Sequence, residues 1–153
     1  MSNEVNATKA NEAPTRLADG TYQPVLTVSD LDRCGRRWML GASIYNYESQ
    51  CAPAVMFATE PALRKIYAGD EEGYRRSLLS TYRYYNATPQ VSGLLLGAGL
   101  ALEDKGHNDA IDAVQDLKIG LMGSLSGVGD TIFAILIPTI FGSIAAYMGQ
   151  AGN

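Results

Sequence analysis

The stretch KIGLMGSLSGVGDTIFAILI, from Lys118 to Ile137, decides the fold because it joins a glycine-rich segment to a run without any charge. All twelve Lys and Arg residues lie at or before Lys118, and no charged side chain follows Asp130 through Asn153. The segment from Ile132 to Met148 is 17 residues long and is otherwise apolar, with interruptions only at Pro138, Thr139, Gly142 and Ser143. A helix that crosses a bilayer needs roughly 17 to 25 such residues. We therefore expect one C-terminal transmembrane helix.

Composition alone conceals this contrast between the two parts of the chain. The 153 residues are 46% hydrophobic and 18% charged, which is typical of a single soluble domain. The net charge of -4 argues against a nucleic-acid partner, because phosphate contacts need a basic surface. Cys34 and Cys51 form no CxxC motif, so we expect two buried, reduced thiols. No motif for a metal or another cofactor is present in the sequence, and we expect none to be bound.

The first 24 residues are polar and contain Pro14 and Pro24. They lack the basic and then apolar order of a signal peptide, and we expect a disordered tail over 1–24. The remaining residues, 25–153, are expected to form one helical membrane domain. No alternation of period two occurs in them, so the sequence predicts an all-α, membrane-associated protein with amphipathic or interfacial helices.

Capping residues predict where the helices begin. Ser29 with Asp32 has the spacing of a capping box, which would open a helix over 30–50 that Pro53 ends or kinks. A short helix is predicted from Glu60-Pro61 to near Gly69. Asp70 is predicted to cap a helix that ends at Asn86. Thr88-Pro89 is predicted to open the helix that contains the apolar run Val91 to Leu102, and Asn108 is predicted to cap a helix over 109–122. The apolar run is too short to span a bilayer, so it predicts a buried or re-entrant helix.

Small residues recur at a spacing of four, which lets helix backbones approach closely in lipid. The pairs are Gly93 with Gly97, Gly123 with Gly127, and Gly142 with Ala146. The alternative is that these glycines only permit turns. We expect a packing surface, toward a partner or a neighbouring helix, built from Gly120, Gly123, Gly127, Gly129 and Asp130. Gly73, in contrast, is expected on a solvated first turn.

Three polar features have competing interpretations. Asp130 is either the N-cap of a helix beginning at Thr131 or a carboxylate at membrane depth that lines a polar pathway. His107 lies in the polar segment EDKGHND, which predicts a solvated loop histidine. Tyr82, Tyr84 and Tyr85, with nearby arginines, fit either a helix at the headgroup level or an aromatic core face. The glycine-rich segment GSLSGVGD lacks the Lys-Ser/Thr of a phosphate-binding loop, so no nucleotide site is expected.

Four motifs in order make the chain resemble the IID component of the mannose/fructose/sorbose family of bacterial sugar phosphotransferase systems. They are YNYESQ at Tyr45 to Gln50, PALRKIY at Pro61 to Tyr67, YYNATPQ at Tyr84 to Gln90, and KIGLMGSLSGVGDTIF at Lys118 to Phe133. The motif residues that carry the resemblance furthest are Asn46, Tyr47, Glu48, Asn86, Pro89 and Lys118. The chain departs from the family pattern at Thr81, Ser124, Ala134 and Ile137, where the family usually has His, Pro, Trp and Arg.

The resemblance implies a non-catalytic membrane subunit that pairs with a IIC subunit for the uptake of mannose/fructose/sorbose-class sugars. Phosphoryl groups would then travel on the IIA and IIB subunits. It also implies a location in the bacterial cytoplasmic membrane. Because every Lys and Arg lies on the N-terminal side of the apolar run, the positive-inside rule predicts that this side is in the cytoplasm. Family members are generally longer, so the chain is expected to be an N-terminal portion, a split gene product or a short form. The alternatives are a small helical membrane-interaction protein without transport activity and, third, a soluble enzyme, for which the sequence offers no catalytic site.

Overall fold

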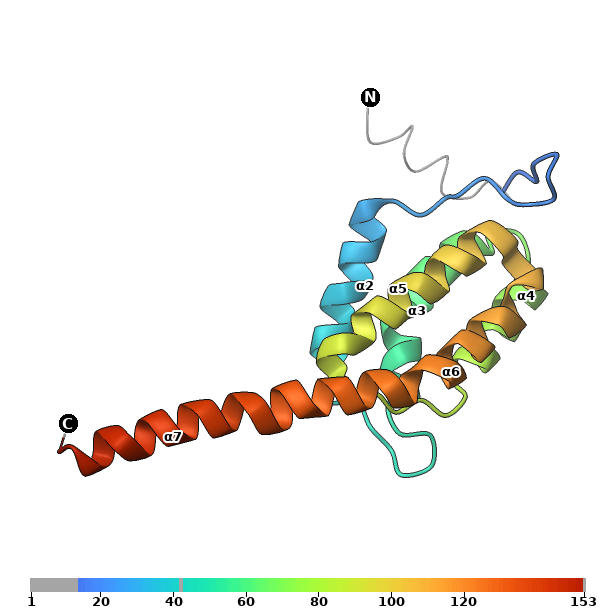
Figure 1. The fold of residues 1–153 in the computed structure, drawn as a ribbon. Coiled ribbons are helices and arrows are strands. Elements are labelled where there is room, and N and C mark those ends of the chain that lie inside the picture. Colours follow the sequence, from blue (N-terminus) through green and yellow to red (C-terminus); the bar gives the residue numbers. More distant parts are fainter. Residues whose placement is uncertain (1–13, 42, 153) are drawn as a thin grey trace.

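The computed structural model describes residues 14–41 and 43–152, and these form a helical body from which one long helix projects (Figure 1). The elements are α2 (Val28–Gly41), α3 (Ala52–Ile66), α4 (Glu71–Thr81), α5 (Pro89–Gly106), the 3-10 helix η1 (His107–Asp109), α6 (Ile111–Gly129), the π-helical turn η2 (Asp130–Leu136) and α7 (Ile137–Gln150). Only isolated bridges, and no strands, occur in these residues. The prediction of an all-α protein is confirmed.

The N-terminal helices differ from the predicted boundaries because their capping residues and prolines act differently. The box at the start of α2 is formed by Thr27 and Asp30, whose backbone amides each bond to the other side chain, and not by Ser29 and Asp32. Helix α2 ends at Gly41 rather than near residue 50. Pro53 lies in the first turn of α3, where its missing N–H costs nothing. The predicted start at Glu60-Pro61 is wrong, because α3 continues through Pro61.

The later starts are partly confirmed. The Asp70 carboxylate accepts a hydrogen bond from the Gly73 amide, as expected of an N-cap, although α4 ends at Thr81 and not at Asn86. Helix α5 begins at Pro89, and its buried Leu95, Leu96 and Leu100 make it a buried helix. Asn108 does not cap α6, whose N-cap is Ala110, and its side-chain amide instead donates to the Asp70 carboxylate over 2.7 Å. Gly73 is buried against these side chains rather than solvated, since an added Cβ would lie 2.8 Å from the Asn108 Oδ1.

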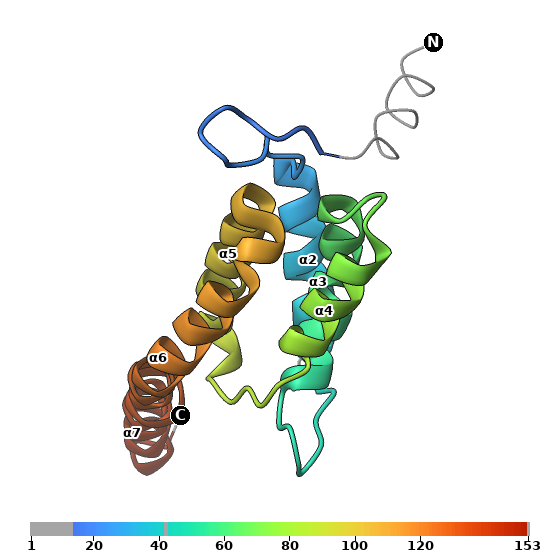
Figure 2. The same ribbon diagram turned by 90° about the vertical axis from the view of Figure 1, so that its right-hand side faces the viewer.

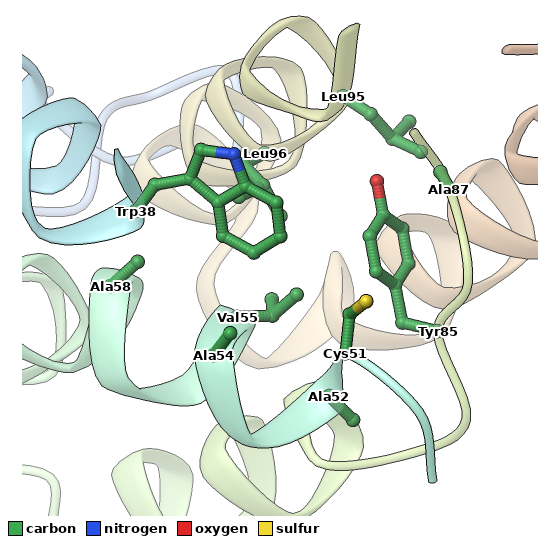
Figure 3. Packing of buried hydrophobic residues seen from close by; sticks show 10 residues of the cluster. All are labelled: Trp38, Cys51, Ala52, Ala54, Val55, Ala58, Tyr85, Ala87, Leu95 and Leu96. Carbon is green, nitrogen blue, oxygen red and sulfur yellow. The ribbon is translucent and has the colours of Figure 1, made fainter. Parts of the chain in front are cut away.

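Two apolar clusters hold the body together, and Figure 3 shows the larger one. It contains Trp38, Cys51, Ala52, Ala54, Val55, Ala58, Tyr85, Ala87, Leu95 and Leu96. The smaller cluster joins α2, α3 and α5 and includes Cys34, Leu63, Ile66 and Leu100. Both cysteines are free and buried, as predicted, and burial raises the pKa of each thiol. Tyr85 belongs to the core, as the second interpretation of these tyrosines predicts. Tyr82 and Tyr84 are exposed, and their place at the headgroup level stays a prediction.

Residues 14–24 form a turn on the body, while residues 1–13 of the predicted tail lie outside the described residues. The Tyr22 amide donates to the Lys105 carbonyl, and the next segment is held by Asp104, whose carboxylate accepts the amides of Val25 and Leu26. These contacts place the segment against the C-terminal end of α5. The boundary of the tail at residue 24 stays a prediction.

Helix α6 continues without a break through η2 into α7, forming a single helix from Ile111 to Gln150. In the described part of the chain, this is the one helix long and apolar enough to cross a membrane. The apolar window within it is not buried by the rest of the chain, and Figures 1 and 2 show it leaving the body. Thr131, Thr139 and Ser143 each donate their hydroxyl to the carbonyl four residues earlier, which satisfies these polar groups inside the helix. The predicted C-terminal span therefore lies on an exposed helix.

His107 is buried, so the prediction of a solvated histidine is wrong. Its side chain is only 4% exposed, and its ring lies 3.8 Å from the ring of Tyr22 and 5.4 Å from that of Tyr67, measured between centroids. The polar segment around it misled the prediction, because tyrosines from distant parts of the sequence cover the ring. Burial lowers the pKa of His107, although the nearby carboxylates of Asp104 and Asp70 act in the opposite direction.

The lowered pKa of His107 predicts a loss of stability in acid. Below about pH 6.5 the unfolded chain binds a proton that the folded chain resists, so the free energy of unfolding falls with pH. We expect the wild type to lose more stability between about pH 7.5 and 5.5 than His107→Asn, since asparagine does not titrate and tolerates the positive φ of 47° at this position. Urea unfolding in detergent at both pH values measures the difference. An equal fall in the free energy of unfolding in the wild type and in His107→Asn would show that His107 does not cause the loss of stability in acid.

Candidate functional site

The predicted interface residues lie where α6 leaves the body. Gly120, Gly123 and Gly127 are exposed, and apart from their own turn of helix no atom of the described residues comes within 4 Å of a Cβ added at any of them. They therefore do not pack on a neighbouring helix of the described chain. The same holds for Gly93, Gly97 and Gly142, so these small residues make no close contact within the described residues. The close contact between α5 and α6 occurs instead at Gly99, where an added Cβ would lie 3.1 Å from Val114.

Gly129 differs from the other interface glycines because it is buried against Thr88. A Cβ added at Gly129 would lie 2.5 Å from the Thr88 Cβ, closer than side chains can approach. The Thr88 hydroxyl lies 2.7 Å from the Asp130 Oδ1 and 3.1 Å from the Ser126 carbonyl oxygen. Its one hydrogen can be donated to either acceptor, and both are on the long helix. Thr88 thus fixes the start of α5 to the start of η2.

Asp130 is not the N-cap of a new helix, because the backbone is helical on both sides of it. Its side chain is exposed and accepts the Thr88 hydrogen bond across 42 positions of sequence. The capping interpretation failed because it treated the glycines before Asp130 as a helix break. The alternative, a carboxylate that serves a polar pathway, stays a prediction.

The family motifs at Tyr45 to Gln50 and at Tyr84 to Gln90 meet next to this junction. The Asn46 carboxamide oxygen accepts hydrogen bonds from the Ser49 amide and hydroxyl, which shapes the loop after α2. At the end of that loop, the Cys51 amide donates to the Tyr85 carbonyl over 2.9 Å. The Pro89 carbonyl accepts the indole N–H of Trp38 at 2.9 Å. Three other motif residues, Tyr47, Glu48 and Asn86, are exposed. Pro89 is half-buried.

Lys118 belongs to a second, buried group of polar residues between α3, α4, α5 and α6. Its ammonium donates to the Thr81 carbonyl over 3.3 Å, and its side chain lines a cavity of about 20 Å³ together with Glu103. The Glu103 Oε2 accepts hydrogen bonds from Tyr67 at 3.0 Å and Ser77 at 2.5 Å. Burial raises the pKa of Glu103, whereas these two hydroxyls and Lys118 favour its ionised form.

Sequence reasoning did not identify Glu103, Tyr67 or Ser77 as members of a site. Each is a single polar residue in or beside an amphipathic helix, where the sequence pattern predicts a solvent-exposed side chain. Only the packing of four helices brings the three residues together. Among residues 14–41 and 43–152, no group of three or more His, Cys, Asp or Glu is placed to hold a metal ion. The arrangement therefore offers contacts that position helices and a surface on α6 that is open to a partner.

Comparisons with known proteins agree with this arrangement. Residues 25–153 match the PTS system mannose/fructose/sorbose family IID component. The chain belongs to this family. It is 33% identical over 136 residues to the PTS system mannose-specific EIID component of Escherichia coli K12, covering 87% of the chain and 48% of that relative. It is 30% identical over 119 residues to the Fructose permease IID component of Bacillus subtilis, covering 76% of the chain and 42% of that relative.

A solved structure has the same fold. It is the complex of the mannose transporter ManYZ with microcin E492, which has a TM-score of 0.75 and 30% identity and covers 86% of this chain and 49% of the matched one. The predicted resemblance to a IID component is confirmed, and IID components are membrane subunits rather than enzymes. The chain spans about half the length of these relatives.

The contact between Gly129 and Thr88 predicts opposite effects for two neighbouring glycines of this IID chain. Gly129→Ala forces a Cβ into Thr88, so we expect a loss of about 2 kcal/mol in the free energy of unfolding. Gly127→Ala meets open space and replaces a poor helix former, so we expect no loss and a gain of up to about 1 kcal/mol. Chemical unfolding of both variants in detergent, followed by circular dichroism, measures the effects. Equal stability of the two variants would show that the junction is not tightly packed.

Proposed function

We propose that this chain is the IID subunit of a phosphoenolpyruvate-dependent sugar phosphotransferase complex and pairs with a IIC membrane subunit. The complex would take up mannose/fructose/sorbose-class sugars, with the IIA and IIB subunits carrying the phosphoryl groups. Family membership over residues 25–153 carries this proposal. The similar solved structure is that of a mannose transporter, ManYZ, which supports the transport role.

The open surface of α6 supports a role in assembly. Gly120, Gly123 and Gly127 are exposed on a long helix and meet no other helix of the described chain, and small residues allow a second helix to approach closely in lipid. Asp130 lies at the C-terminal end of this surface, already held by Thr88. We infer that the IIC subunit packs a helix against Gly120, Gly123 and Gly127, next to Asp130. Gly129, which the same expectation included, is covered by Thr88 and lies outside this open surface.

The orientation follows from charge. Every Lys and Arg precedes the apolar segment, and positively charged flanks stay in the cytoplasm. We therefore place the helical body on the cytoplasmic side of the membrane. The C-terminal end of α7 would then lie on the opposite side. The alternative function is a membrane-interaction protein without transport activity. It has the same fold and differs in having no IIC partner.

Assembly can be tested with a variant that fills the glycine surface. Gly127→Leu should leave the isolated chain folded, because no atom lies near this position, and should weaken co-purification with the IIC subunit at least about tenfold. Gly35→Leu is the matched control, since Gly35 is also an exposed helical glycine with no atom within 4 Å. Gly73→Leu is unsuitable as a control because Gly73 is buried. Wild-type recovery of IIC with Gly127→Leu would remove this surface from the proposed interface, and no recovery with the wild type would favour the alternative.

A further inference from the structure

A group of large apolar side chains is exposed at the end of α2 and in the loop that follows it. We call this group the rim patch, and it consists of Met39, Leu40, Ile44, Tyr45 and Tyr47. Leu40 is 80% exposed and Tyr47 is 94% exposed, so residues 14–41 and 43–152 provide them with almost no cover. The five side chains follow one another closely in sequence, and exposed apolar side chains that form one patch mark a surface for a partner or a membrane.

Hydrogen bonds fix the rim patch at the level where the charge-free helix begins. Trp38, directly before Met39, donates its indole N–H to the Pro89 carbonyl, and Cys51, at the end of the loop, donates its amide to the Tyr85 carbonyl. Thr88, between these two acceptors, binds Asp130. The short segment 85–89 therefore connects both ends of the rim patch to the last charged residue before the apolar segment.

The arrangement of the elements agrees with these contacts. In both views the loop after α2 and the departing α7 lie at the same, lower end of the body (Figures 1 and 2). Helix α2 lies on the side of the body toward which α7 extends, and it runs across the direction of α7 (Figure 1). If α7 crosses a bilayer, the surface of that bilayer runs along α2, whose C-terminal end and following loop lie at the level where α7 departs (Figure 1).

We propose that the rim patch is a membrane-surface anchor that rests in the headgroup region of the bilayer around the base of α7. This inference rests on the proposed membrane crossing of α7. Tyrosine is enriched at membrane interfaces because its ring is apolar and its hydroxyl is polar. Exposed Glu48 lies within the loop, and Arg36 and Arg37 lie one turn before Leu40, so these charges keep the patch at headgroup depth. The contact fixes the orientation of the body relative to the membrane.

Tryptophan substitutions test this contact in the full chain, reconstituted into phosphatidylcholine vesicles that contain brominated lipids. The measured quantity is the quenching of tryptophan fluorescence by the bromine atoms. Leu40→Trp and Tyr47→Trp probe the patch, Phe141→Trp probes the apolar helix, and Leu79→Trp, an exposed position on α4, is the control. The native tryptophan, Trp38, is buried and contributes the same background to every variant. We expect bromines near the headgroups to quench both patch probes at least about twofold more than the control. Bromines deep in the acyl chains should quench Phe141→Trp most strongly.

The outcomes separate the two proposals. Patch probes that are quenched no more than Leu79→Trp, while Phe141→Trp is quenched by deep bromines, would overturn the anchor and leave the crossing intact. That result would assign the rim patch to a protein partner instead. A Phe141→Trp probe that no brominated lipid quenches would overturn the membrane crossing and the anchor with it. Circular dichroism of each variant establishes that the body is folded before vesicles are added.

Discussion

The contact of the Thr88 hydroxyl with the long helix, at Asp130 and the Ser126 carbonyl, is the interaction on which the rest of the structure depends. It joins the start of α5 to the point where the long helix leaves the body, and it works only because Gly129 leaves room for Thr88. The indole of Trp38 and the amide of Cys51 bond to carbonyls on either side of Thr88. The short segment 85–89 thus sets the direction of the helix, the position of α2 and the position of the loop between α2 and α3.

The long helix has two different environments, and its residues change accordingly. Before Asp130 it packs on α5, with Lys118 and Val114 buried among the helices of the body. After Asp130 it carries no charge and is exposed throughout, and its hydroxyls bond back to its own carbonyls. The exposed glycines lie at the change from one environment to the other. The proposed pairing with a IIC subunit would need both a firm body and an open helix face, and the long helix combines the two.

The sequence predicted what depends on local patterns. The all-helical class, the apolar segment after Asp130, the Asp70 cap and the buried cysteines follow from composition, spacing and capping. Some errors are local, such as the box expected at Ser29 and the helix start expected at Glu60, where another cap or a tolerated proline applies. The errors at the buried polar residues occur where a distant segment supplies the partner. His107 looked solvated because its neighbours in sequence are polar, but Tyr22 and Tyr67 cover it. Asp130 looked like a cap because nothing in the sequence indicates that Thr88 lies beside it. The buried contacts of Glu103 likewise come from distant parts of the chain.

The central claim is that one unbroken helix joins the body to the membrane through this junction, and a distance measurement tests it most directly. Spin labels at Asp112→Cys and Tyr147→Cys, both exposed positions, can be introduced after Cys34 and Cys51 are replaced by alanine. A continuous helix rises about 1.5 Å per residue, so electron paramagnetic resonance in lipid nanodiscs should give one narrow distance of about 50 Å. A distribution centred below about 40 Å, which requires a bend or break near the glycines, would contradict the account.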